Sequence, residues 1–242
     1  MVRLILFLVV AAQLRAQDLS VEQIIAKAIE AIGGQANLAK VDSIELKARI
    51  RFGQGEFGPL RVVAKRPSLF RMEMTIGPDH VTQAYDGAIG WQAVTGEHKQ
   101  DPVVLTGESL AHLIDQAANA IGGPLIDLEK RHNEVSLAGR EPVNGVDCYK
   151  LKVTLGTGDT MDVFLDPTTF QTVQEELPMR LEGRSSTIQE SVGNYRKFGS
   201  ILMACLFVTH EKGGEDGQRM EIDAVEINPK VDASVFKMPA AK

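Results

Sequence analysis

The spacing of apolar residues is helical near the start of the chain. Apolar side chains between residues 21 and 32 recur every three or four positions, and Ser20 and Gln23 have the spacing of a capping box. The Gly33-Gly34 pair that follows is typical of a helix end. This pattern predicts an amphipathic helix with one apolar face.

Most of the remaining chain alternates between apolar and polar residues, which is the pattern of a strand with one solvent-exposed face. The clearest alternating segments are residues 44–52, 60–66, 70–76 and 149–155. Gly-Pro, Asp-Gly and Gly-Gly clusters separate such segments, as an antiparallel meander requires. A second helical stripe runs from about Glu108 to Ile121. We therefore expect a mainly β protein of the α+β class, with one strongly curved antiparallel sheet and two helices.

No internal repeat, low-complexity linker or charge run marks a second domain, so a single domain is expected over residues 17–242. The apolar face of so large a sheet must be covered by barrel closure, by a second sheet or by a lid. Each predicted helix has an apolar face available for this role.

The chain begins MVRLILFLVVAAQLRAQ, with an early arginine, an apolar run and a small residue before a polar stretch. This pattern predicts a cleaved secretory signal over residues 1–16. The apolar run is shorter than the roughly 20 residues of a membrane-spanning helix, and no later apolar stretch reaches that length. We expect a soluble exported protein located in the periplasm, and not an integral membrane protein.

Charge argues against nucleic-acid binding. The chain has 26 basic and 32 acidic residues, and loss of Arg3 and Arg15 with the signal would leave 24 against 32, a net charge near −8. Such a surface repels nucleic acid and anionic lipid headgroups. The two cysteines, Cys148 and Cys205, are too few for a disulfide framework, and the sequence leaves open whether they pair.

The sequence contains no recognisable catalytic motif. None of the five histidines pairs at the spacing of a zinc helix, and neither a nucleophile elbow nor a phosphate-binding loop is present. The acidic pair Glu175-Glu176 is interpreted as solvated strand or turn residues. We therefore expect no enzyme activity, no metal site and no cofactor.

Two residues, Trp91 and Arg66, have both a structural and a functional interpretation. In AYDGAIGWQA, Asp86-Gly87 signals a two-residue hairpin, and Trp91 either packs as a strand aromatic or lies at the mouth of a ligand cavity. In LRVVAKR, strand parity places Arg66 on the apolar side. Arg66 either turns into solvent before Pro67, or it needs a carboxylate or backbone carbonyls, such as those at a helix end.

Several short segments carry a resemblance to a known family. AKRPSLFRMEM, followed by YDGAIGW, resembles the LolA-like family of periplasmic lipoprotein carriers, which sort outer-membrane lipoproteins, and FLDPTTFQTVQEE and INPKVDASVFKMP add to the likeness. The resemblance implies a half-open, strongly curved antiparallel β-barrel closed by a lid of α-helices, with an apolar interior for acyl chains. It also implies that Arg66 latches the lid and that Phe70 lies near the cavity mouth.

On this reading the hydrophobic cavity should be lined by Leu46, Ile50, Val62, Phe70, Met72, Met74, Trp91, Leu113 and Ile114. The methionines Met72 and Met74 suit a cavity that adapts to varied ligands, although ordinary core packing explains them equally well.

The resulting hypothesis is a periplasmic carrier that binds acyl chains of lipoproteins or lipids and ferries them toward the outer membrane. Its partners would be acylated lipoproteins or lipids, with an inner-membrane release complex and an outer-membrane acceptor, and it would act as a monomer. One alternative is a periplasmic sensor or regulatory module of the same fold that binds a membrane partner or a lipidated ligand. Another is an envelope structural protein with a filled core.

Overall fold

A computed structural model describes residues 19–181, 184–214 and 217–240. The predicted signal, residues 1–16, lies outside the described residues. The elements in chain order are α1 (Val21–Ala31), α2 (Gln35–Leu38), β1 (Ser43–Phe52), β2 (Gly58–Lys65), β3 (Leu69–Ile76), β4 (Asp79–Tyr85), β5 (Gly90–Thr95), β6 (Gln100–Val104), α3 (Gly107–Asn119), α4 (Leu128–Arg131), β7 (Glu134–Val143), β8 (Val146–Thr154), β9 (Thr160–Leu165), β10 (Thr172–Leu181), β11 (Arg184–Gly193), β12 (Arg196–Phe198), β13 (Ile201–Met203), β14 (Leu206–Glu211), β15 (Gly217–Ile227) and the 3-10 helix η1 (Ala233–Phe236).

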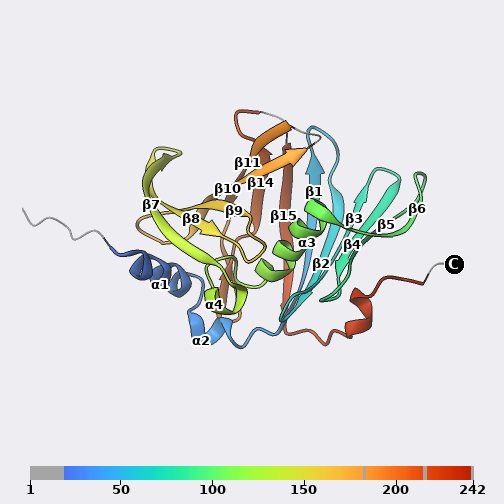
Figure 1. Ribbon diagram of the computed structural model, residues 1–242, viewed down its shortest axis with the longest axis horizontal. Helices are drawn as coiled ribbons and strands as arrows, with labels where there is room; N and C mark the ends of the chain where they lie inside the picture. The colour runs from blue at the N-terminus through green and yellow to red at the C-terminus, as the bar shows by residue number, and fades with distance from the viewer. Residues whose placement is uncertain (1–18, 182–183, 215–216, 241–242) are drawn as a thin grey trace, which may run out of the picture.

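The main element is one antiparallel sheet of thirteen strands in the order β6-β5-β4-β3-β2-β1-β15-β14-β11-β10-β9-β8-β7. Most strands that follow each other in sequence pair as hairpins. Strand β11 pairs with β14, because β12 and β13 between them form a separate two-stranded sheet, and β1 pairs with β15 to join the two halves. The sheet curls without closing, because β6 and β7 remain at opposite ends of the order (Figure 1). The sequence-based prediction of a mainly β, half-open antiparallel sheet is confirmed.

The two predicted long helices occupy the concave side. In α1, the Ser20 hydroxyl accepts from the Gln23 backbone N–H and the Gln23 side chain accepts from the Ser20 N–H, so the capping box is present. Ile24 and Ala28 of this helix pack with the buried residues of β8 and β9. Helix α3 lies across the other half of the sheet, against β3, β4 and β5 (Figure 1).

Strand alternation builds the core. Inner residues of β1, β2 and β3 pack with Leu113 and Ala117 of α3 in one cluster, and α1 with β8 and β9 forms a second. Cys148 and Cys205 are buried free thiols in separate clusters, so they do not pair in the structure. Among the described residues, no helix is long and apolar enough to cross a membrane.

Candidate functional site

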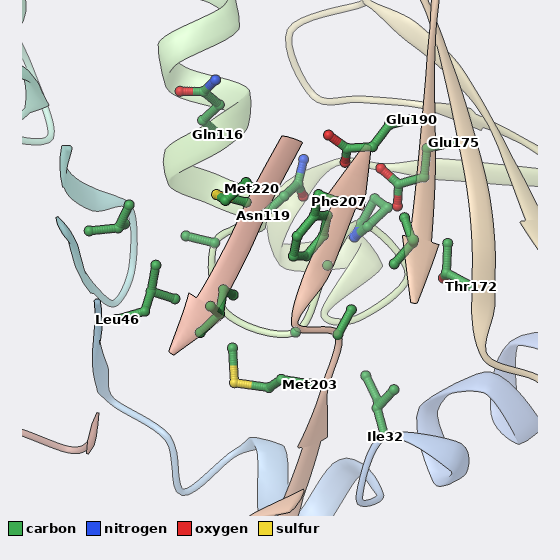
Figure 2. A pocket seen from close by; sticks show the side chains of 18 of the residues that line it. Ile32, Leu46, Gln116, Asn119, Thr172, Glu175, Glu190, Met203, Phe207 and Met220 are labelled. Atoms are coloured by element: carbon green, nitrogen blue, oxygen red, sulfur yellow. The ribbon is translucent and has the colours of Figure 1, made fainter. Parts of the chain in front are cut away.

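A cavity of about 450 Å³ lies on the concave side of the sheet, a volume within the range of small-molecule sites. It is enclosed by the inner faces of the strands, by α1 and α3, and by the segment after α3 (Figure 2). Its apolar lining includes Ile29, Ile32, Ile44, Leu46, Ile50, Leu60, Val62, Phe70, Met72, Val192, Leu202, Met203, Phe207, Met220 and Ile222. The alternating pattern of the strands creates this wall, because every second residue points inward.

Five of the nine predicted cavity residues line this cavity, namely Leu46, Ile50, Val62, Phe70 and Met72. They lie on the neighbouring strands β1, β2 and β3, where register places Leu46 beside Val62 and Val62 beside Met72. Phe70 is 6% exposed and forms part of both the core and the cavity wall.

Three further predicted cavity residues do not line it. Met74, two residues beyond Met72, packs against the core beside Leu60 and borders a separate shallow surface pocket. Leu113 is 2% exposed and fills the contact between α3 and the sheet. Ile114 is half-buried on α3 and is not among the lining residues.

The prediction that Trp91 lies in the cavity is wrong. Trp91 is on the outer face of β5, where its indole N–H donates to the Phe236 carbonyl at 2.8 Å and the Arg71 guanidinium lies 5.6 Å from its ring centroid. The 3-10 helix η1 covers it and leaves it 1% exposed. The structural alternative, a packed strand aromatic, is the one observed.

The turn before Trp91 is longer than the predicted two residues. Strand β4 ends at Tyr85 and β5 begins at Gly90, so four residues form the turn. The Asp86 carboxylate accepts hydrogen bonds from the backbone N–H groups of Ala88 and Ile89, which stabilises this longer form.

Arg66 has both kinds of partner that the strand parity requires. Its guanidinium donates from Nε to the Val41 carbonyl at 2.8 Å and from Nη2 to the Leu38 carbonyl, the last residue of α2, at 3.4 Å. Nη1 donates to the Asp127 carboxylate at 2.7 Å. The end of β2 is thereby fastened to α2 and to the segment that joins α3 and α4.

Asp127 and Arg131, which the sequence analysis missed, complete this network. Burial raises the pKa of Asp127, but the hydrogen bond and charge of Arg66 outweigh it and place the pKa below its ordinary value. Arg131 donates to the Ile121 and Gly123 carbonyls after α3, and burial followed by the charge of Arg66 lowers its pKa to about 10. The sequence signal that could have identified Asp127 was its position as an acidic residue between two apolar ones, Ile126 and Leu128.

One wall of the cavity is polar. Glu175 of β10 and Glu190 of β11 are directly opposite each other in the strand register, and both carboxyl groups point into the cavity (Figure 2). A bulge between Thr172 and Gln174 lets Thr172 also face inward, and the Tyr195 hydroxyl donates to the Thr172 carbonyl at 2.9 Å.

Burial changes the acidity of this wall. Burial, and then the charge of Glu190, raises the pKa of Glu175 to about 8. Burial also raises the pKa of Glu190, although the hydrogen bond from Thr209 opposes this. Burial and the charge of Glu175 raise the pKa of Tyr195 to about 12.

The interpretation of Glu175-Glu176 as solvated residues is therefore wrong for both. Glu175 faces the cavity, whereas Glu176, on the opposite face of β10, is 7% exposed and accepts from the Lys212 ammonium at 2.8 Å. Within the described ranges, no group of three or more His, Cys, Asp or Glu residues is placed to hold a metal ion.

Comparison with known proteins gives a likeness of fold. No protein-family model matches the chain, and no curated protein sequence does. Among solved structures, a DUF1329 family protein from Desulfovibrio piger aligns with a TM-score of 0.59 at 12% identity, covering 90% of this chain and 97% of that one. A LolA superfamily protein from Nitrosomonas europaea aligns with a TM-score of 0.56 at 13% identity, covering 90% and 98%.

A putative outer-membrane lipoprotein-sorting protein domain from Vibrio parahaemolyticus aligns with a TM-score of 0.55 at 10% identity, covering 90% of this chain and 95% of that one. The fold and the cavity define a half-open antiparallel sheet of the LolA-like type. The resemblance found in the sequence is thus confirmed at the level of fold.

Proposed function

We propose that the protein is a periplasmic carrier that binds acyl chains of lipoproteins or lipids and releases them toward the outer membrane, acting by binding and not by catalysis. The observation that carries the proposal is the apolar cavity of about 450 Å³ inside a half-open sheet. The solved proteins of this fold support it, since one is described as a putative lipoprotein-sorting domain.

Hydrophobic transfer would supply the affinity. Each methylene moved from water to an apolar cavity gains about 0.8 kcal/mol, and opening of the cover would offset part of this gain. A carrier needs such an offset, because it must release its ligand.

In this proposal α3 and the segment after α3 act as the lid, and Arg66 is its latch. Arg66 suits this role because one guanidinium joins the Asp127 carboxylate of that segment to the Leu38 and Val41 carbonyls, which lie just before β1. Its loss would free the segment after α3 from the end of β2.

Native mass spectrometry tests the proposal on protein secreted into the periplasm of a bacterial host and purified without detergent. We expect bound masses of phospholipid or acylated peptide, with an occupancy that changes in Arg66→Leu. Arg61→Leu is the matched control, because Arg61 lies on the outer face of the same strand and pairs with Glu45 and Glu73. Protein that is bare in every sample and takes up no added lipid would overturn the carrier and favour the regulatory module.

A further inference from the structure

The two carboxyl groups in the cavity are the feature that acyl-chain binding does not explain. A cavity built only for hydrocarbon has no need of Glu175 and Glu190, whose burial carries a desolvation cost. They are adjacent across β10 and β11, and their side chains share one direction in Figure 2.

Within the described residues, the Glu175 carboxyl group has no hydrogen-bond partner. Glu190 accepts a hydrogen bond from the Thr209 hydroxyl at 2.7 Å, whereas no residue in the described part of the chain donates one to the Glu175 carboxyl. Glu175 keeps some accessible surface, but that surface faces the cavity and the side chain is otherwise enclosed by protein. When it is ionised, a buried carboxyl group without a protein donor needs a donor from elsewhere.

The charges that line the cavity have one sign. Glu175 and Glu190 are the only acidic side chains among the described lining residues, which include no Lys, Arg or His. The other polar lining groups are neutral: the amides of Gln116, Asn119 and Gln218, the Thr172 side chain and the Tyr195 hydroxyl, which is already bonded to a backbone carbonyl. A phosphate, sulfate or carboxylate in this space would meet two acids and no base.

We propose that the cavity selects amphiphiles whose polar end is a cationic amine, with the ammonium group held by Glu175 and Glu190 and the apolar chain lying against β1, β2 and β3. This proposal rests on the proposed function, because it assumes that the cavity accepts amphiphiles. The ammonium supplies a hydrogen-bond donor and a positive charge that pair with the Glu175 carboxylate. The aromatic rings of Phe207 and Tyr195, which also line the cavity, add attraction for a cation.

The test compares three ligands with the same ten-carbon chain and different heads: decylammonium, decyl maltoside and decyl sulfate. Each is titrated into the purified protein below its micelle concentration, and binding is followed by calorimetry at mildly alkaline pH. We expect the cationic ligand to bind about tenfold more tightly than the neutral one, as one strong interaction with a charged group would give, and the anionic ligand to bind most weakly.

The Glu175→Gln, Glu190→Gln double variant should lose the preference for the cation and keep its affinity for decyl maltoside. Glu176→Gln is the matched control, because Glu176 is the next residue on the same strand but lies on the outer face, paired with Lys212. That variant should keep the preference. Circular dichroism confirms that each variant is folded.

The outcomes separate the two proposals. Equal binding of the cationic and neutral ligands by the unaltered protein, or a preference that survives in the double variant, overturns the amine-selective site and leaves the carrier intact. Failure of all three ligands to bind overturns the proposed function itself.

Discussion

The Arg66 guanidinium and the Asp127 carboxylate lie 2.7 Å apart and join the end of β2 to the segment that follows α3. The pair is shielded, with 24% of the Arg66 side chain and 11% of the Asp127 side chain exposed. Residues far apart in sequence are therefore connected beside the cavity by a charge-assisted hydrogen bond.

Loss of this pair should destabilise the protein measurably. Arg66→Leu leaves Asp127 buried without its main partner, and we expect the free energy of unfolding to fall by about 2 to 4 kcal/mol. Arg61→Leu removes a more exposed arginine and should cost about 1 kcal/mol or less. Urea denaturation followed by circular dichroism measures both, and equal effects of the two substitutions would contradict the structural role of Arg66.

Trp91 should not respond to cavity ligands. It is the single tryptophan of the chain and lies under η1 on the outer face, so its fluorescence reports that face alone. Saturation with decyl maltoside should leave its emission maximum unchanged, whereas Phe236→Ala should shift it to the red by admitting water. A large ligand-induced shift of the emission maximum would contradict this placement and indicate that Trp91 lies in the cavity.

Stability should depend on pH through Glu175. Its pKa is raised from the ordinary 4.5 to about 8, with Glu190 opposite and Tyr195 nearby as the titratable groups that face it. Between these two pH values the folded protein holds a proton that the unfolded chain releases, so this group lowers the free energy of unfolding as pH rises through the window.

The matching experiment is denaturation of Glu175→Gln beside the unaltered protein at about pH 5 and about pH 9. The neutral amide cannot ionise, so the variant should gain stability relative to the unaltered protein at the higher pH and much less at the lower one. Glu176→Gln again serves as control. A difference that is the same at both pH values would show that Glu175 keeps an ordinary pKa.

Filling the cavity should block ligand uptake. Val192 lines the cavity from β11, and Val192→Trp would place an indole in the space that a chain needs. We expect loss of decyl maltoside binding in calorimetry with the fold retained. Val103→Trp, on the exposed edge strand β6, is the control and should bind normally. Full binding by Val192→Trp would place the ligand elsewhere.

Strand parity bears on two side chains beside the cavity, Arg66 and Glu175. The position of Arg66 on an apolar face left two alternatives, a turn into solvent or a buried partner, and the structure shows the second, with carbonyls and a carboxylate as partners. In TVQEEL, the same argument would have placed Glu175 on the same face as Leu177, two residues away, and singled it out. The acidic pair was instead interpreted as solvated.

Other features lie beyond the reach of local patterns. Alternation assigns Trp91 to a face without telling which face is concave, and only the packing of η1 against β5 decides it. Asp127 reaches Arg66 across 61 positions of sequence, a contact that depends on how α3 crosses the sheet.

The most direct test of ligand binding in this cavity is a nuclear magnetic resonance titration of methyl-labelled methionines with decyl maltoside. Met72, Met203 and Met220 line the cavity, whereas Met161 is buried beneath α1 in a separate cluster. The account predicts saturable shifts of the three lining methyl resonances while that of Met161 stays in place. Unchanged lining methyls at ligand saturation, or a shift confined to Met161, would contradict it.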